Sequence, residues 1–297
     1  MSTVIVGGGI TGLLLSYSLS DSLVVDFKGP KNSMASLWTI IPPLCGDLFG
    51  DCLRSEEIYS TLCNKLGVNF KKVNVIRSSE KKLGGKIIES KEIKELEPKV
   101  NLEYAELFDN GMFVEGPQII SSLTKDINMK KEMVKKIVFD NKSISYLETE
   151  NGKIRADQYI FTLGYGIYEL IKGLYNIDVN YFKGHLIITM KIGLKGILIV
   201  NDRIAVEGDN LYLNGDSKPQ QDQSIDYEEI SKTLKTFSNV IGPITDKLEV
   251  KVGFRTVVPT GPIVTRISDN AILVGGHKLG FALAPILVEK AISLLKG

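Results

Sequence analysis

The chain has 297 residues, and its 36 Lys and Arg nearly balance 35 Asp and Glu. The length suits about two domains with a sizeable core, and the balanced charge gives no support for nucleic acid or an anionic membrane surface as a partner. No apolar run reaches the roughly 20 residues that span a bilayer, and the N-terminus lacks the basic segment of a secretory signal. We therefore expect a cytoplasmic protein without a transmembrane segment.

The first 26 residues predict a strand, a glycine-rich turn, a helix and a second strand. Residues 3–6 are a short β-branched run, as in strands that are buried on both faces. A G-x-G-x-x-G turn over 7–12 follows, residues 13–19 contain neither Gly nor Pro, and residues 22–26 read as the second strand. This order is typical of the start of a doubly wound α/β sheet.

The glycine turn predicts a dinucleotide site. Gly7 permits the tight turn, Gly9 lets a pyrophosphate approach the backbone, and Gly12 lets the helix pack closely on the strand. The helix N-terminus offers N–H groups to the phosphates. Asp26, 19 positions after Gly7, is expected to accept hydrogen bonds from the ribose hydroxyls, which disfavours NADP. A turn that serves backbone geometry alone is the alternative, and the fingerprint does not separate FAD from NAD.

The middle of the chain alternates short helices and strands. The expected helices cover 55–66, 91–96 and 116–126, and the expected strands cover 133–139, 143–149 and 158–163. Asn151-Gly152 predicts a hairpin turn between the last two strands. Short strands at 185–192, 196–200, 203–206 and 211–213 predict a meandering antiparallel sheet. A helix at 225–237, strands at 248–255 and 271–275, and a final helix at 282–295 complete the prediction.

Cysteine usage and composition add weaker expectations. Cys45, Cys52 and Cys63 match no common zinc motif, so we expect free, buried thiols in a reducing compartment and no metal site. Lys, Glu and Ile are plentiful and Gln is scarce, which suggests a thermophile or reflects genome base composition. The two histidines, His185 and His277, form no evident nucleophile triad or metal cluster.

The most specific signal lies in residues 252–288. Gly253-Phe254-Arg255, Gly261-Pro262 and the run from Gly275 through Ala284-Pro285 resemble three segments of the D-amino-acid oxidase/glycine oxidase superfamily of FAD-dependent oxidoreductases. These are its Gly-x-Arg-Pro segment, its Asp-Gly-x-Pro turn, and its Gly-His…Gly…Leu-Ala-Pro segment. Softer matches at 33–38, 111–117, 160–164 and 182–185 extend the resemblance over essentially the whole chain. The family's Pro, Asp and Gly are replaced here by Thr256, Thr260 and Ser36, and the Lys278-Leu279 loop is shorter.

The resemblance implies a fold and a domain division. The fold class is α/β, with α+β for the second domain. A Rossmann-like FAD-binding domain is expected, with an interleaved substrate domain built on a mainly antiparallel sheet. The FAD-binding domain is expected at 1–70, 111–180 and 252–297, and the substrate-binding domain at 71–110 and 181–251.

The resemblance also implies a set of cofactor contacts. Glycines near the flavin ring let the ring approach the backbone closely. The N-terminus of the last helix suits the anionic edge of a reduced flavin. We expect non-covalent FAD, because no Cys lies near the Gly-His segment and no His lies near the fingerprint. The contacts implied are Gly7, Gly9, Ile10, Thr11, Gly12, Asp26, Phe27, Ser33, Ala35, Ser36, Leu37, Gly164, Gly275, Gly276, His277, Lys278, Leu279, Gly280, Phe281 and Ala282.

The function implied is oxidation of a small amino acid or N-methyl amino acid, by hydride transfer from the α carbon to flavin N5. Arg255 is expected to bind the substrate carboxylate, with a structural salt bridge as the alternative. His277 is a scaffold or a catalytic group, and Tyr212, like Tyr181, assists the carboxylate or packs in the sheet. Other options are a 2-hydroxy acid or glycerol 3-phosphate as substrate, or a non-catalytic flavoprotein subunit. The electron acceptor, oxygen or a quinone or dye, stays open, and a homo-oligomer is one option.

Overall fold

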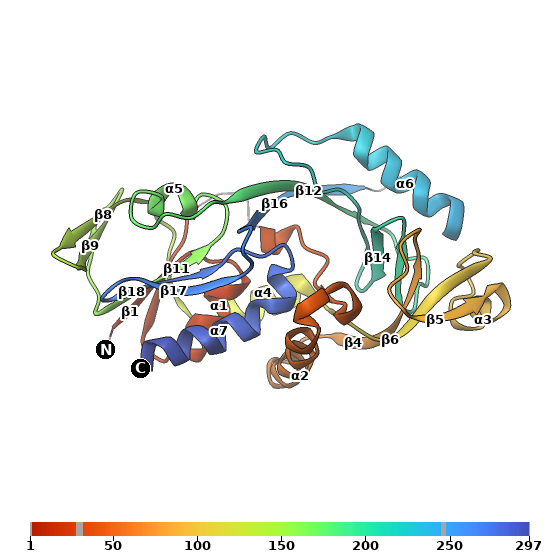
Figure 1. Ribbon diagram of the computed structural model, residues 1–297, viewed down its shortest axis with the longest axis horizontal. Helices are drawn as coiled ribbons and strands as arrows, with labels where there is room; N and C mark the ends of the chain where they lie inside the picture. The colour runs from red at the N-terminus through yellow and green to blue at the C-terminus, as the bar shows by residue number, and fades with distance from the viewer. Residues whose placement is uncertain (1, 28–31, 245–247, 297) are drawn as a thin grey trace. The chain divides into compact units, whose positions relative to one another are not determined.

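Figure 1 shows the computed structural model, which describes residues 2–27, 32–244 and 248–296. Its elements cluster into two units that alternate along the chain. Unit 1 comprises Met1–Ser33, Pro117–Phe182 and Phe254–Gly297, and unit 2 comprises Met34–Gly116 and Lys183–Gly253. The interleaving expected from the sequence is therefore present. Residues 34–70, which we assigned to the FAD-binding domain, fall in unit 2, and the functional assignment of the domains stays a prediction.

Unit 1 is built on a sheet with the order β17-β18-β11-β1-β2-β7 in the described part of the chain. The pairs β18–β11, β11–β1, β1–β2 and β2–β7 are parallel, and β17 is antiparallel to β18. The strands are β1 (Thr3–Val6), β2 (Ser22–Val25), β7 (Asn128–Lys130), β11 (Gln158–Leu163), β17 (Ile263–Ser268) and β18 (Ala271–Gly275). Every residue of β1 is buried, as a continuous β-branched run in a parallel sheet requires. The doubly wound α/β sheet predicted from residues 1–26 is confirmed, whereas β7 and β17 were not predicted.

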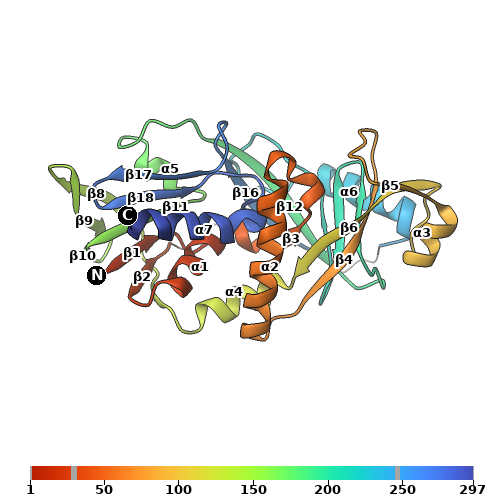
Figure 2. The ribbon, with the colours of Figure 1, turned by 60° about the horizontal axis from the view of Figure 1, so that its bottom comes forward.

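Among the described residues, four helices belong wholly or mainly to unit 1. They are α1 (Ile10–Ser18), α4 (Gly116–Thr124), α5 (Ile167–Ile171) and α7 (Gly280–Lys296). Helix α7 is apolar along most of its first half, from Phe281 to Val288, and all of these residues are buried. It packs along α1 and along β17 and β18, as Figure 2 lets the reader follow. The amino ends of α1 and α7 are therefore held by one packed core.

A small sheet of order β10-β9-β8 lies on the same unit in the described residues. Its strands are β8 (Val134–Asp140), β9 (Ser143–Thr149) and β10 (Gly152–Ile154). The predicted hairpin turn at Asn151-Gly152 exists, but it joins β9 to β10. The prediction that it leads into 158–163 was wrong, because those residues form β11 and pair in parallel with β1.

Unit 2 is built on a sheet whose described strands run in the order β16-β12-β15-β14-β13-β4-β6-β3, with β5 paired to β6. Strands β13, β14, β15 and β12 form antiparallel neighbours, which confirms the predicted meander, and β13 pairs in parallel with β4. The strands are β3 (Thr39–Ile40), β4 (Phe70–Ser78), β5 (Lys86–Glu89), β6 (Tyr104–Val114), β12 (Asn180–Thr189), β13 (Ile197–Val200), β14 (Arg203–Glu207), β15 (Leu211–Asn214) and β16 (Glu249–Val257). Strands β12 and β16 run from one unit's segment into the other's.

The helices of unit 2 cover apolar faces of its core. They are α2 (Phe49–Leu66), α3 (Ser90–Leu96) and α6 (Tyr227–Ile241), with short 3-10 turns η1 (Asn32–Met34) at the unit border, η2 (Pro42–Leu44) and η3 (Gly46–Leu48). Asp226 precedes helix α6 and caps it, because its side chain accepts a hydrogen bond from the N–H of Glu229. Buried Ile230 and Phe237 of α6 join the apolar core formed by the sheet.

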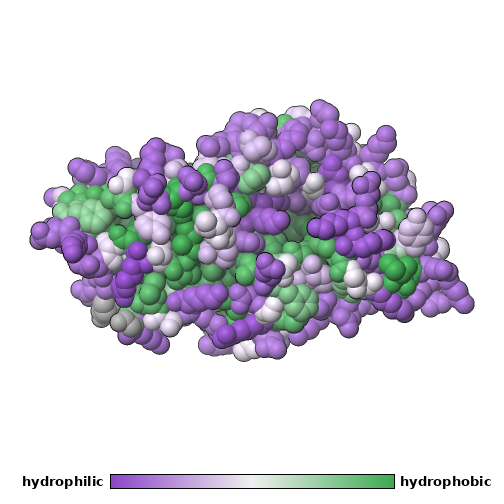
Figure 3. Space-filling view, in the orientation of Figure 1, coloured by the Kyte–Doolittle hydropathy of each residue, from purple (hydrophilic) through white to green (hydrophobic). Residues whose placement is uncertain are grey.

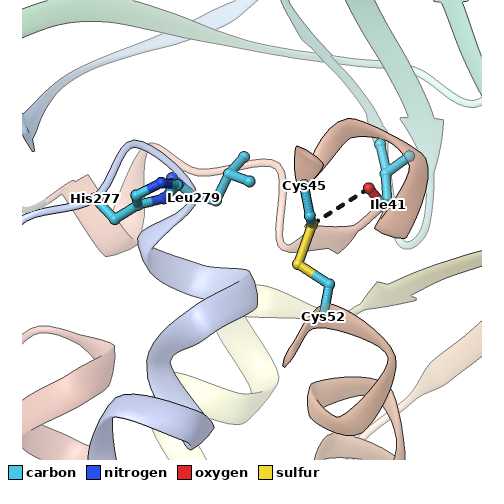
Figure 4. The surroundings of a disulfide bond; sticks show 5 residues. All are labelled: Ile41, Cys45, Cys52, His277 and Leu279. Carbon is cyan, nitrogen blue, oxygen red and sulfur yellow. Dashed lines mark hydrogen bonds between the residues drawn. A yellow bond between two sulfur atoms is a disulfide. The ribbon is translucent and has the colours of Figure 1, made fainter. Parts of the chain in front are cut away.

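The expectation of three free thiols was wrong. Cys45 and Cys52 form a disulfide that links the turn before η3 to the first turns of α2 (Figure 4). The Cys45 Sγ also lies 3.5 Å from the carbonyl oxygen of Ile41. This contact is not a hydrogen bond, because a sulfur in a disulfide carries no hydrogen to donate. Cys63 is free and buried, and burial raises the pKa of its thiol to about 11, so this thiol is unreactive.

Among the described residues, no helix is long and apolar enough to cross a membrane. Figure 3 shows hydrophilic side chains interspersed with apolar ones on one face of the molecule. Exposed large apolar residues such as Phe49, Ile87 and Tyr227 lie on different elements, which is ordinary for a protein surface.

Candidate cofactor-binding site

Four of the predicted cofactor residues lie at one edge of the unit 1 sheet. Gly7 follows β1, Asp26 follows β2, Gly164 follows β11, and Gly275 ends β18. These strands are parallel neighbours, so their carboxyl ends meet at the same edge. In open α/β sheets this edge is where ligands bind. The structure therefore brings together residues that the sequence separates by up to 268 positions.

The turn after β1 requires glycine at Gly7 and at Gly12. Gly7 has a φ of 112°, and a Cβ there would lie 2.3 Å from Thr162 Oγ1. A Cβ on Gly12 would lie 1.9 Å from the carbonyl oxygen of Gly7, which is backbone and cannot move aside. The helix thus starts in direct contact with the turn, and its first N–H groups face the edge of the sheet.

Two side chains accept hydrogen bonds from N–H groups of this turn. Asp26 is 8% exposed, and its Oδ1 accepts a hydrogen bond of 2.9 Å from the N–H of Gly8. Ser33 Oγ accepts a hydrogen bond of 2.9 Å from the N–H of Ile10, the first residue of α1. Gly9, which caps α1, has no side chain, so the helix N-terminus carries no capping group of its own. Asp26 and Ser33, both named from the sequence, therefore contact the turn.

A cavity of about 150 Å³ opens beside the turn. Its walls are mostly apolar, and it lies where β1 and β2 end. The lining residues are Val6, Gly7, Val25, Phe27, Glu132, Met133, Val134, Gly166, Ile167 and Leu170. An apolar slot next to a phosphate-type turn and an acid suits the adenosine half of a dinucleotide. The donor set and the glycine cradle therefore fit FAD, and they fit NAD as well.

A second pair of glycines precedes α7. Gly275 has a φ of 133° and Gly276 a φ of 84°, and a Cβ on Gly276 would lie 2.6 Å from Val258. The loop continues to Gly280, where a Cβ would meet nothing within 4 Å, and Phe281 and Ala282 are buried in the first turn of α7. The backbone at 275–276 is thus restricted to glycine, as the sequence suggested for a close approach to the ring.

His277 is bound within this loop. Its Nδ1 accepts a hydrogen bond of 3.1 Å from the N–H of Leu279, so Nδ1 carries no proton. Burial and the nearby Lys278 ammonium lower the pKa of the imidazole. A neutral ring that fixes the turn before α7 supports the scaffold alternative for His277.

The predicted contacts Ala35, Ser36 and Leu37 belong to unit 2. Ser36 Oγ accepts a hydrogen bond of 3.2 Å from the N–H of Trp38. Trp38 is fully buried and has a φ of 52°, which is unusual for a bulky residue. A Cβ on Gly116 would lie 1.9 Å from the Trp38 ring, so Gly116 makes room for this indole. Trp38 fixes the end of the 35–37 segment, and the sequence analysis, which included it in the 33–38 match, assigned it no role.

The proposed substrate residues differ in how they are held. Arg255 lies half-buried on β16, between Phe254 and Thr256, which are buried. Alternation along the strand turns its side chain to the opposite face from theirs. Phe254 stacks on Tyr165 with ring centroids 4.5 Å apart, which anchors this end of β16 in unit 1.

Tyr212 is 1% exposed, and its hydroxyl donates a hydrogen bond of 2.7 Å to Glu115 Oε1. Its ring also packs edge-on against Trp38 and face-on against Phe113. Tyr181, on β12, packs against Tyr165, and burial raises the pKa of its hydroxyl to about 12. For both tyrosines the geometry supports the packing alternative. The acid Glu115 was missed, because nothing local in the sequence pairs it with a residue 97 positions away.

Among the described residues, no group of three or more His, Cys, Asp and Glu side chains is arranged to hold a metal ion. His185, the other histidine, is 2% exposed. Its Nδ1 lies 2.6 Å from Asp216 Oδ2, and its Nε2 accepts the N–H of Asp226 at the start of α6. Both ring nitrogens are thus engaged in holding the loop before α6 to β12.

Comparison with solved structures identifies the fold. Glycine oxidase from Bacillus cereus superposes with a TM-score of 0.87 at 15% identity, covering 100% of this chain and 97% of that one. Iminodiacetate oxidase from a Chelativorans species gives 0.86 at 18% identity, over 99% and 95% of the two chains. The chain has the glycine oxidase fold. Glycine oxidase from Geobacillus kaustophilus, with a TM-score of 0.84 at 18% identity over 99% and 94%, agrees.

The glycine oxidase fold confirms the resemblance and the fold class predicted from the sequence. No protein-family model matches the sequence, and no curated protein is significantly similar to it. The likeness therefore lies in the three-dimensional arrangement of the elements and covers nearly the full length of both chains. Identities of 15–18% carry no residue roles from those enzymes to this one.

Proposed function

We propose that this protein is an FAD-dependent oxidoreductase that oxidises a small amino acid or N-methyl amino acid. One observation carries the proposal. A glycine turn held by Asp26 and by Ser33 lies at the carboxyl edge of the unit 1 sheet, in a chain that shares its fold with glycine and iminodiacetate oxidases over nearly its whole length.

Different residues of unit 1 would bind different parts of the cofactor. The N–H groups at the start of α1 would hold the diphosphate, Asp26 the ribose hydroxyls, and the apolar cavity beside Phe27 the adenine. The N-terminus of α7, from Gly280, would stabilise negative charge at the far end of the cofactor, because a helix N-terminus is electropositive. When bound, FAD supplies the acceptor, at N5, for a hydride from the substrate's α carbon. We propose that it binds without a covalent link.

The chain's own task is to bind and orient the substrate. The Arg255 guanidinium would hold the substrate carboxylate through two parallel hydrogen bonds, which fixes the α carbon. A neutral His277, held by the N–H of Leu279, keeps the loop before α7 in place. Cofactor chemistry of this kind needs orientation and electrostatics more than an acid–base pair from the protein.

The function is tested by colour and by bleaching. The purified protein, reconstituted with FAD, should be yellow, and an anaerobic screen should find a small amino acid or N-methyl amino acid that bleaches the flavin. If only a 2-hydroxy acid or glycerol 3-phosphate bleaches the flavin, that compound class is the substrate and the amino acid assignment is wrong. A protein that binds NAD and no FAD would overturn the proposal, and one that binds FAD but is bleached by none of these substrates would be a non-catalytic flavoprotein.

The carboxylate role is tested at Arg255. Arg255→Ala should raise KM about 100-fold, because hydrogen bonds to a charged group are worth about 1.5–3 kcal/mol. Arg255→Lys should recover only part of the loss, because an ammonium lacks the two-pronged geometry. Arg266→Ala is the control, since Arg266 is an exposed arginine of unit 1 that donates to the Leu294 carbonyl oxygen. Unchanged KM in Arg255→Ala would remove the substrate role.

We also propose a cytoplasmic location in a thermophile. Intracellular proteins of hyperthermophiles are often rich in disulfides, so the Cys45–Cys52 bond is compatible with that compartment. Alkylation of free thiols in a fresh lysate, before and after reduction, tests this by reporting whether the bond exists in the cell.

Oxygen uptake measured beside dye reduction identifies the electron acceptor, and light scattering identifies the oligomeric state.

A further inference from the structure

Thr162 contacts the glycine turn from the side of β11. It is 7% exposed, and its Oγ1 lies 3.1 Å from the carbonyl oxygen of Val6 and 3.1 Å from that of Gly7. The hydroxyl is the donor, because a carbonyl oxygen can only accept, and its single proton is shared between the two carbonyl oxygens. A side chain from β11, 155 positions further along the chain, therefore bonds the turn's own backbone.

The opposite side of the same two peptide groups is also bound. The N–H of Gly7 donates to the Val25 carbonyl oxygen at 2.9 Å, and the N–H of Gly8 donates to Asp26 Oδ1 at 2.9 Å. In a trans peptide the C=O and the N–H point in opposite directions. The Val6–Gly7 and Gly7–Gly8 peptides are therefore each held at both ends, by Thr162 on the β11 side and by β2 with Asp26 on the other.

This arrangement sets the direction of the turn. Gly7, with a φ of 112°, has wide conformational freedom, so the backbone alone does not fix the orientation of the peptides around it. With both peptides held, the chain enters α1 at one angle, and the N–H groups at the start of the helix face the sheet edge. Preorganised donors bind an anion more tightly than donors that must first be ordered.

We propose that Thr162 is a positioning residue for the cofactor diphosphate, acting through the peptides of Gly7 and Gly8. The inference rests on the proposed function, because it concerns the same FAD site. Thr162 bonds the backbone of the turn and is not one of the predicted cofactor contacts, so its loss weakens binding without removing any of those contacts.

The test uses Thr162→Val, which keeps the shape and removes the hydroxyl, and Thr162→Ser, which keeps the hydroxyl. FAD is titrated into flavin-free full-length protein, and flavin fluorescence gives the Kd. We expect about a tenfold weaker Kd for Thr162→Val and a value within about twofold of the wild type for Thr162→Ser. Should Thr162→Val not fold, Thr162→Cys, with a weaker donor of similar size, serves for the same comparison.

Thr233→Val is the matched control for general loss of stability. Thr233 is 2% exposed, belongs to unit 2, and donates to the Glu229 carbonyl oxygen. Its variant should unfold more easily and bind FAD as the wild type does. Equal Kd values for Thr162→Val and the wild type would overturn the positioning role and leave the proposed function standing. A wild-type protein that binds no FAD would overturn both.

Discussion

In each of the two units, a buried acid holds a glycine turn. In unit 1, Asp26 accepts the N–H of Gly8 in the turn between β1 and α1. In unit 2, Glu106 Oε1 accepts the N–H groups of Leu83, Gly84 and Gly85 in the loop between β4 and β5. Both turns demand glycine, since Gly84 has a φ of 88° and a Cβ on Gly85 would lie 2.7 Å from Phe108.

The two turns differ in what surrounds them. Glu106 is 1% exposed, and its second oxygen accepts a hydrogen bond of 2.7 Å from the Arg77 guanidinium. Its charge is therefore balanced within unit 2. The unit 1 turn runs into a helix N-terminus, beside a cavity and at the carboxyl edge of parallel strands. A glycine turn with an acid is thus no sign of a nucleotide site by itself, and the elements around it decide.

The largest effect is expected from a substitution that disrupts the unit 1 turn. Gly12→Ala places a Cβ 1.9 Å from the Gly7 carbonyl oxygen, so we expect FAD binding to be lost and stability to fall by about 4 kcal/mol. Denaturant unfolding and FAD titration measure both. Gly50→Ala is the control, because a Cβ at this α2 position meets nothing within 4 Å, and its stability should stay equal or rise. A Gly12→Ala protein that binds FAD normally would contradict the assigned turn.

The next effect concerns Glu106. Burial disfavours its charge, but the backbone N–H groups and the Arg77 guanidinium together hold the pKa of its carboxyl below the ordinary value. Glu106→Gln leaves Arg77 without its buried partner, so we expect a loss of about 3 kcal/mol at pH 7. FAD affinity should not change, because Glu106 holds a loop of unit 2 and is not a predicted cofactor contact.

The pH dependence gives the Glu106 prediction a sign. A carboxyl whose pKa is lower in the folded than in the unfolded protein stabilises the folded state. This stabilisation is fully present above the unfolded-state pKa, near 4.5, and is lost as the pH falls through the folded-state pKa. The stability gap between wild type and Glu106→Gln should therefore narrow below about pH 4.5. Glu103→Gln, at an exposed position, should lie within about 0.5 kcal/mol of the wild type. A gap that is constant down to pH 3 would show that charge is not the cause.

The smallest effect concerns Tyr212. Removing the hydroxyl in Tyr212→Phe leaves Glu115 without one buried donor, so we expect a loss of about 1 kcal/mol in stability. Turnover and KM should stay within about twofold of the wild type. Tyr227→Phe, at a residue that is 75% exposed, controls for the loss of a hydroxyl. If Tyr212→Phe loses about 100-fold in kcat/KM with its stability intact, the side chain acts on the substrate and the packing role is wrong.

Local patterns predicted the elements that carry their own signal. The β-branched run before Gly7, the glycine spacing and the acid at Asp26 predicted the opening of the sheet. The alternating runs after residue 185 predicted the meander. Sequence reasoning failed where two distant segments decide together. The hairpin at Gly152 returned to β10 because β11 pairs with β1, and Cys45 and Cys52 came together because η3 and the first turns of α2 bring them within bonding reach.

The sequence by itself determined the class of the sheet, the glycine turn and the candidate cofactor residues next to it, because these depend on spacing within the first 26 residues. Only the tertiary structure decided that Thr162 holds the Gly7 carbonyl and that Tyr212 donates to Glu115. These bonds join residues 155 and 97 positions apart, and strand order and register fix them. No local pattern records which strand will lie beside which, so these partners emerge only when the sheets are assembled.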